Sequence, residues 1–133
     1  MVDISFNKIS RELKKFEFPP FDIVVGIARG GVVPAMLIAH QFDRELVLLT
    51  FNYRDDTNQP RYDEPVFLSG NIKDIPKHKK ILLVDDVSVS GKTLNAAKAL
   101  LRDYQVTTFA LKGKADLALF TDIRECVNWP WKT

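Results

Sequence analysis

Residues 82–94, Leu-Leu-Val-Asp-Asp-Val-Ser-Val-Ser-Gly-Lys-Thr-Leu, decide the fold of this chain. The run begins one residue earlier, and 81–84 is predicted to be a strand buried on both faces, as in a parallel sheet. Asp85 and Asp86 end that strand, a short turn of small residues follows, and a helix is predicted over 92–103. The inner face of that helix is predicted to carry Leu94, Ala97, Leu100 and Leu101.

Strand and helix patterns alternate along the rest of the chain. Further helices are predicted over 6–16 and 32–42. Further strands are predicted at 23–27, 46–51 and 106–111, with a short one at 117–120 and a closing segment at 126–131. This order indicates an α/β fold with a mostly parallel sheet and right-handed crossovers. In such sheets ligands bind beyond the carboxyl ends of the strands, which singles out the turns 28–31, 52–65 and 85–93.

Composition narrows the class of protein. The chain has 133 residues, 46% of them hydrophobic and 27% charged, so we expect a single globular domain over 1–133. A net charge of +2 argues against a nucleic-acid binder. No apolar run is long enough for a membrane span and no secretory signal is visible. The single cysteine, Cys126, excludes an internal disulfide, so the expected location is the cytoplasm.

The turn after Asp86 suits a phosphate. The first turn of a helix offers unpaired N–H groups and partial positive charge, Ser88, Ser90 and Thr93 add donors, and Gly91 permits close approach of the backbone. Two adjacent carboxylates need hydroxyl donors or a cation if they are buried, which a sugar diol and Mg²⁺ would supply. A Walker A loop is rejected because Asp86 occupies its first glycine position. An ordinary turn with Ser90 as a helix cap is the alternative.

The stretch 82–94 closely resembles the 5-phosphoribosyl-1-diphosphate (PRPP) motif of type I phosphoribosyltransferases. The resemblance implies a Rossmann-like fold whose central sheet is flanked by helices, with a small hood built from the chain ends. It also implies that Asp85 and Asp86 hold the ribose hydroxyls and that Asp86 approaches Mg²⁺. Lys92 would add charge at the 5-phosphate, or be an ordinary solvated lysine.

Residues 26–35 resemble the pyrophosphate loop of the same family. Arg29 would be a charged donor and a catalytic residue together with the acidic pair, and a non-proline cis peptide is common in this loop. The alternative is a glycine turn with a solvated arginine. The implied PRPP-binding residues are Arg29, Gly30, Gly31, Asp85, Asp86, Val87, Ser88, Val89, Ser90, Gly91, Lys92 and Thr93.

The polar segment 53–65 matches the position of the family's mobile loop, in which Tyr53 and Arg54 are the residues of interest. A plain surface excursion, with a hairpin to 66–68, is the alternative. On the nucleobase side the resemblance implies Lys112, as well as Val127 and Trp129 in a tail like that of the xanthine- and hypoxanthine-guanine-type enzymes. Simple packing is the alternative for the tail tryptophans.

Two residues depart from the purine enzymes. Val89 stands where those enzymes usually carry an aspartate that is proposed to exchange a proton with the purine, and Cys126 stands where a base-stacking aromatic is often found. Both lie on the nucleobase side.

The resulting prediction is a Mg²⁺-dependent transferase that moves the ribosyl 5-phosphate of PRPP to a nucleobase, with a purine favoured, and releases pyrophosphate. A homo-oligomer, dimer or tetramer, is expected from the family. A PRPP- or nucleotide-binding regulator without base chemistry is the second hypothesis, and an α/β domain with neither property is the third.

Overall fold

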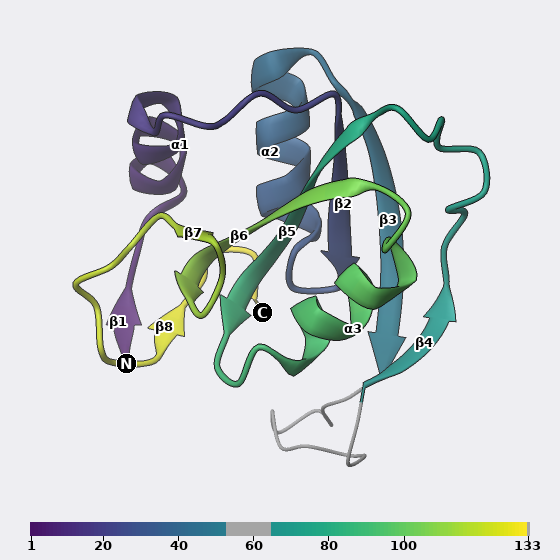
Figure 1. Cartoon of the computed structure of the whole chain (residues 1–133). Helices are drawn as coiled ribbons and strands as arrows, with labels where there is room; N and C mark the ends of the chain where they lie inside the picture. The colour runs from purple at the N-terminus through teal and green to yellow at the C-terminus, as the bar shows by residue number, and fades with distance from the viewer. Residues whose placement is uncertain (53–64, 133) are drawn as a thin grey trace.

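The computed structural model describes residues 1–52 and 65–132 (Figure 1). Its main sheet has six strands in the order β4-β3-β2-β5-β6-β7, parallel except for β4 at one edge. The strands are β2 (Ile23–Ala28), β3 (Glu45–Asn52), β4 (Val66–Ser69), β5 (Lys80–Ser88), β6 (Gln105–Gly113) and β7 (Leu117–Ala118). The predicted α/β fold with a mostly parallel sheet is therefore confirmed.

Helices cover both faces of this sheet. The helices are α1 (Phe6–Lys15), α2 (Val32–Phe42) and α3 (Lys92–Leu100). Ile9 of α1 and Ile38 of α2 lie in one core cluster, while Leu94 of α3 belongs to a second cluster on the other face. Alternate residues of a strand point to opposite faces, so the central strands are apolar on both sides, as the uninterrupted run 81–84 predicts.

The connections that follow β2 and β5 show at which edge of the sheet a ligand is expected to bind. From β2 the chain passes through α2 to β3 on one side, whereas from β5 it passes through α3 to β6 on the other, and β2 and β5 are neighbours. This reversal is the topological switch point, where open α/β sheets bind ligands. The turns after β2 and after β5 therefore lie at the same edge.

The two chain ends meet beside the main sheet. Strand β1 (Val2–Asp3) pairs in parallel with β8 (Val127–Asn128), and the amide of Asn128 donates to the carboxylate of Asp3 at 3.0 Å. This pairing is the hood that the family resemblance implies. No helix in the described part of the chain is long and apolar enough to cross a membrane.

Most predicted boundaries lie within two residues of the observed ones, whereas β5 and α3 end further from the predicted residues. β5 continues through the acidic pair to Ser88 because it keeps its register with β6 as far as Gly113. α3 ends at Leu100, not Asp103, and the N–H of Leu101 closes its last turn on the carbonyls of Ala97 and Lys98. Leu100 is 41% exposed and does not belong to the inner face. The predicted strand 117–120 shrinks to β7.

Candidate functional site

The acidic pair lies in the last part of β5 and is nearly closed off from solvent. Asp85 and Asp86 are each 8% exposed. The N–H of Asp86 donates to Oδ1 of Asp85 at 2.8 Å, and the N–H of Val87 donates to Oδ1 of Asp86 at 2.7 Å. These bonds to the local backbone fix both side chains and engage one oxygen of each.

Burial raises the pKa of Asp85 well above its ordinary value, and the adjacent Asp86 raises it further. The positive charge of Lys132 opposes part of this rise. Two buried carboxylates side by side are costly to ionise together without a cation. A bound cation or hydroxyl donors would therefore stabilise the ionised form of this pair.

Three distant segments meet at the carboxylate of Asp86. A Cβ added to Gly30 would lie 2.5 Å from Oδ1 of Asp86, so the carboxylate rests directly on the backbone of the turn after β2. From the C-terminal tail, Nζ of Lys132 lies 4.0 Å from Oδ2. Only glycine fits at position 30 with Asp86 in this conformation.

The turn after β2 has the features implied for a pyrophosphate loop. The Ala28–Arg29 peptide bond is cis, as the resemblance suggests, and the side chain of Arg29 is exposed. Gly31 caps α2 without any side-chain hydrogen bond to the first turn. A Cβ on Gly31 would lie 2.7 Å from the carbonyl oxygen of Val84, so this loop packs tightly against β5.

The turn after β5 leads into α3 through Gly91, which has a φ of 83° and is the N-cap. That left-handed conformation favours glycine, and no side chain caps the helix. The predicted alternative of Ser90 as the cap is wrong: its hydroxyl accepts from the N–H of Lys92 at 3.3 Å, one residue inside the helix. Ser88 is buried, whereas Val89 is 64% exposed at the tip of the turn.

The residues implied for the nucleobase side lie on β6 of the main sheet and on the C-terminal tail from β8 onward. Lys112 pairs with Val87 in the β5–β6 register and is half-buried. Val127 is buried in β8. Trp129 is 1% exposed and stacks on Trp131 at 5.5 Å between ring centroids.

The burial of Trp129 favours the packing alternative for its ring, and Trp131 is the more exposed member of the stacked pair. Cys126, at the position of the family's stacking aromatic, is exposed. Tyr53 and Arg54 lie outside the described residues.

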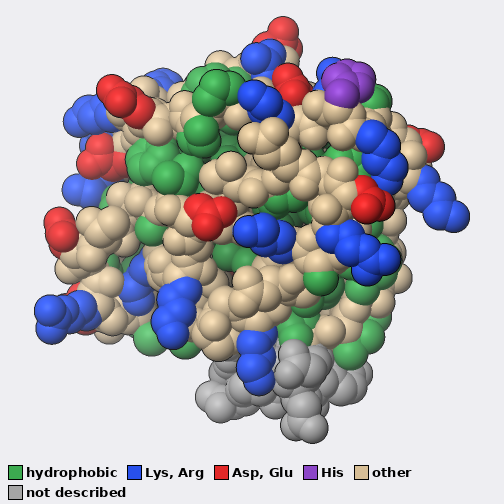
Figure 2. Space-filling model, in the orientation of Figure 1, with side chains coloured by type: hydrophobic (Ala, Val, Ile, Leu, Met, Phe, Trp, Pro, Cys, Tyr) green, Lys and Arg blue, Asp and Glu red, His purple; other side chains and the backbone are tan. Residues whose placement is uncertain are grey.

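Lys132 is the site residue that the sequence did not indicate. A lysine next to the C-terminus has no pattern of its own, and only the folding of the tail back to β5 brings it near Asp86. The basic side chains do not mark the site by clustering either: Figure 2 shows Lys and Arg spread over the visible face rather than gathered in one stripe.

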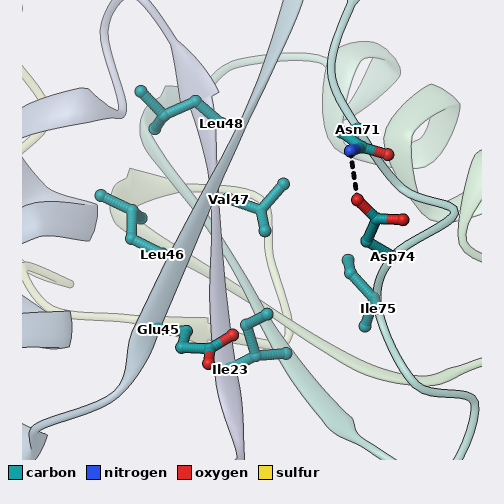
Figure 3. Close-up of a pocket in the computed structure, with 8 residues that line it drawn as sticks. All are labelled: Ile23, Glu45, Leu46, Val47, Leu48, Asn71, Asp74 and Ile75. Atoms are coloured by element: carbon teal, nitrogen blue, oxygen red, sulfur yellow. Dashed lines mark hydrogen bonds between the residues drawn. The ribbon is translucent and has the colours of Figure 1, made fainter.

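A separate pocket of about 400 Å³ lies at the other end of the sheet (Figure 3). It is lined by Ile23 and Glu45, the first residues of β2 and β3, and by the segment that contains Asn71 and Asp74. Within that segment, the side-chain amide of Asn71 donates to the carboxylate of Asp74 at 2.6 Å (Figure 3). Because the acidic pair lies near the carboxyl end of β5, this pocket is not part of the candidate site.

The donor set at the acidic pair fits Mg²⁺ together with a substrate. This ion usually keeps several waters and takes one or two carboxylates plus substrate phosphates. Within the described ranges, no group of three or more His, Cys, Asp or Glu side chains could hold a metal ion. Asp85 and Asp86 would therefore complete a site only when a ligand supplies further oxygens.

Comparison with known proteins identifies the family of this chain. The phosphoribosyl transferase domain family matches residues 7–124. The chain belongs to this family. A xanthine-guanine phosphoribosyltransferase of Cereibacter sphaeroides is 34% identical over 108 residues, covering 81% of this chain and 64% of that protein. The chain thus spans less than two thirds of the length of the curated relatives it matches.

Two further similar proteins broaden the comparison. A transcriptional regulator, GfcR of Methanocella arvoryzae, is 32% identical over 84 residues, covering 62% of this chain and 40% of that protein. The crystal structure of a purine phosphoribosyltransferase from Pyrococcus horikoshii superposes with a TM-score of 0.80 over 99% of this chain and 93% of that one, at 23% identity. The type I phosphoribosyltransferase fold is thereby confirmed.

Proposed function

We propose that this protein transfers the ribosyl 5-phosphate of PRPP to a nitrogen of a purine base and releases pyrophosphate. The observation that carries the proposal is the meeting of the acidic pair of β5 with the turn after β2, together with the glycine-capped start of α3 that follows β5. In a chain of this family, that arrangement provides places for ribose hydroxyls, diphosphate and 5-phosphate within one edge of the sheet.

In this proposal the chain contributes mainly positioning and electrostatics. The turn 88–93 and the first turn of α3 bind the 5-phosphate through backbone N–H groups and hydroxyls. Asp85 and Asp86 accept hydrogen bonds from the ribose hydroxyls. Arg29 and the amide of Gly30 bind the diphosphate, whose bond to the anomeric carbon breaks as the bond from the base nitrogen forms, whereas the N–H of Gly31 already donates to the carbonyl of Ile27 at 2.7 Å. The base passes the proton of that nitrogen to solvent water, because Val89 offers no acceptor and lies at the exposed tip of the turn.

Mg²⁺ belongs to the proposal through Asp86. When bound, this ion would neutralise charge on the departing diphosphate. The chain's own task is to hold the carboxylate of Asp86 in place, which the N–H of Val87 does at 2.7 Å and the backbone of Gly30 does by contact.

The choice of a purine rests on the xanthine-guanine relative and on the placement of Lys112. This lysine lies one strand away from the acidic pair, in register with Val87, where its ammonium would meet an exocyclic oxygen of an oxopurine. Val127 would offer backbone groups to the base edge. Trp129, buried beneath Trp131, would act by holding the tail.

A second candidate function is a regulator that binds PRPP or a nucleotide without turnover. Two observations favour it: a relative named as a transcriptional regulator, and the exposed Val89 at a position where the purine enzymes usually carry an acid.

Pyrophosphate release separates the two functions. PRPP and Mg²⁺ are supplied with adenine, guanine, hypoxanthine, xanthine, uracil or orotate, one base per assay, and Asp86→Asn serves as the negative control. Release with a purine, lost in the variant, is the expected result. PRPP binding without release with any base would favour the regulator, and absence of both would reject the whole proposal.

A further inference from the structure

The C-terminal tail delivers a cation to the acidic pair. Nζ of Lys132 lies 4.0 Å from Oδ2 of Asp86, the carboxylate oxygen opposite the one that accepts from Val87. The side chain of Asp86 is 11% exposed, whereas that of Lys132 is 52% exposed. The charge of Lys132 also acts on Asp85, whose pKa it lowers against the effect of burial.

The backbone of the tail is anchored while the lysine side chain is not. Trp129 is buried in the core, Trp131 stacks on it, and the N–H of Lys132 donates to the carbonyl of Trp129 at 3.1 Å. The ammonium is carried on a long, half-exposed stem, and an ion pair of this kind contributes little and is easily broken. The tail therefore presents Lys132 to Asp86 without locking it there.

The contact conflicts with the ligand-bound state of the proposed function. A divalent cation approaching Oδ2 of Asp86 would meet the ammonium of Lys132, and two cations at one carboxylate repel each other. We propose that Lys132 is a resident counter-ion of the acidic pair, which leaves Asp86 when PRPP and its divalent cation bind. This inference rests on the proposed function.

The consequence is a site that discriminates against the bare metal ion. Mg²⁺ alone would have to displace Lys132 in return for few protein ligands, whereas Mg²⁺ with PRPP gains phosphate and hydroxyl oxygens as well. Lys132 thus acts as a positioning residue that couples metal binding to substrate binding.

The opposite role, attraction of the anionic substrate, predicts the opposite sign. If Lys132 binds PRPP directly, its removal weakens PRPP binding at every Mg²⁺ concentration. If it is a displaced counter-ion, its removal eases binding at low Mg²⁺ and has no effect at saturating Mg²⁺.

The experiment is calorimetric titration of the full chain with Mg²⁺ alone, and with PRPP over a series of Mg²⁺ concentrations. It compares the wild type with Lys132→Ala, with Lys132→Arg, which keeps the charge, and with Lys14→Ala, which removes an exposed charge on α1. Lys132→Ala is expected to lower both the Kd for Mg²⁺ alone and the Mg²⁺ concentration for half-maximal PRPP binding by about two- to fivefold. The other two variants are expected to match the wild type, and thermal unfolding shows that all are folded.

Unchanged Mg²⁺ dependence in Lys132→Ala, or weaker PRPP binding at saturating Mg²⁺, would overturn the inference. Absence of PRPP binding in every protein would reject the proposed function, and with it the displacement of Lys132 that rests on it.

Discussion

Gly30 lies in the turn after β2 and Asp86 in the last part of β5, and their contact makes position 30 a test of the site at the residue scale. A Cβ at this position would lie 2.5 Å from Oδ1 of Asp86. In Gly30→Ala the carboxylate must rotate away from the loop, which moves it from the place where it would meet the ribose. We expect a folded protein with PRPP affinity reduced about ten- to hundredfold, the range for a lost hydrogen bond to a charged group.

Gly26→Ala is the matched control for this prediction. Gly26 lies in β2, and its added Cβ would meet Ala35 at 2.7 Å rather than Asp86. It is expected to lower the melting temperature while the folded protein keeps its PRPP affinity. Calorimetric titration with PRPP and Mg²⁺ measures the affinity of both variants, and thermal unfolding measures their melting temperatures. Equal affinity in Gly30→Ala and the wild type would show that the position of the Asp86 carboxylate does not matter for binding.

Val89 offers a test of base chemistry at the same scale. Its side chain is 64% exposed, so a carboxylate can replace it without a desolvation cost. General acid–base catalysis contributes about 10²- to 10⁴-fold when the group is well placed. We therefore expect Val89→Asp to raise kcat for a purine by about tenfold or more, and Val89→Asn, which has the same shape without the proton, to leave it unchanged. Equal rates in the two variants would remove the missing acid as the limit on turnover.

Single elements show what local sequence patterns could and could not predict. The central strands and α1 and α2 follow directly from runs and spacings of apolar residues, and the acidic pair and its turn were predictable because their chemistry is local. The predicted inner face of α3 was wrong at Leu100. Leu100 and Leu101 are the same residue type in adjacent positions, and only the packing in the structure shows that the second is the buried one. The contacts of Asp86 with Gly30 and Lys132 join residues far apart in the chain, and no local pattern encodes them.

The start of β5 provides a pH-dependent prediction at the element scale. The N–H of Lys80 donates to Oδ2 of Asp22 at 2.8 Å, and the N–H of Asp22 donates to the carbonyl of Lys80 at 2.8 Å. The hydrogen bond from Lys80 is the largest cause that holds the pKa of Asp22 below its ordinary value. A depressed pKa means stability that is present above the unfolded pKa, about 3.9, and is lost as the pH falls through the folded value.

Asp22→Asn keeps an acceptor but removes this titration. The difference in unfolding free energy between wild type and variant is expected to be present at neutral pH and to shrink below about pH 4. Urea unfolding of both proteins at a series of pH values measures this difference. If the difference in unfolding free energy stays constant down to pH 2, the ionisation of Asp22 does not cause it, and the stabilisation comes from the fit of the side chain instead.

At the scale of the whole molecule, one buried side chain links the two chain ends to the site. Trp129 is 1% exposed in the core cluster that also contains Ile4 and Val127, and it follows directly after β8, which pairs with β1. Beyond it the tail carries Lys132 to Asp86. Loss of this anchor should therefore loosen the hood and the contact of Lys132 with Asp86 first, while the main sheet keeps its second cluster, on the α3 face, which does not contain Trp129.

Trp129→Ala is expected to lower the free energy of unfolding by about 3–5 kcal/mol, the cost of removing a fully buried large aromatic side chain. Hydrogen exchange tests whether the damage reaches the other end of the chain, because the N–H of Val2 donates to the carbonyl of Cys126 at 2.9 Å. The amide of Val2 should exchange faster in the variant by a larger factor than amides in the centre of β5. Trp131→Ala, which removes the half-buried partner, should have a smaller effect on both measurements. Uniform acceleration of all amides would mean that the hood and the main sheet unfold as one unit, and Trp129 would then stabilise the whole molecule rather than the tail that serves the site.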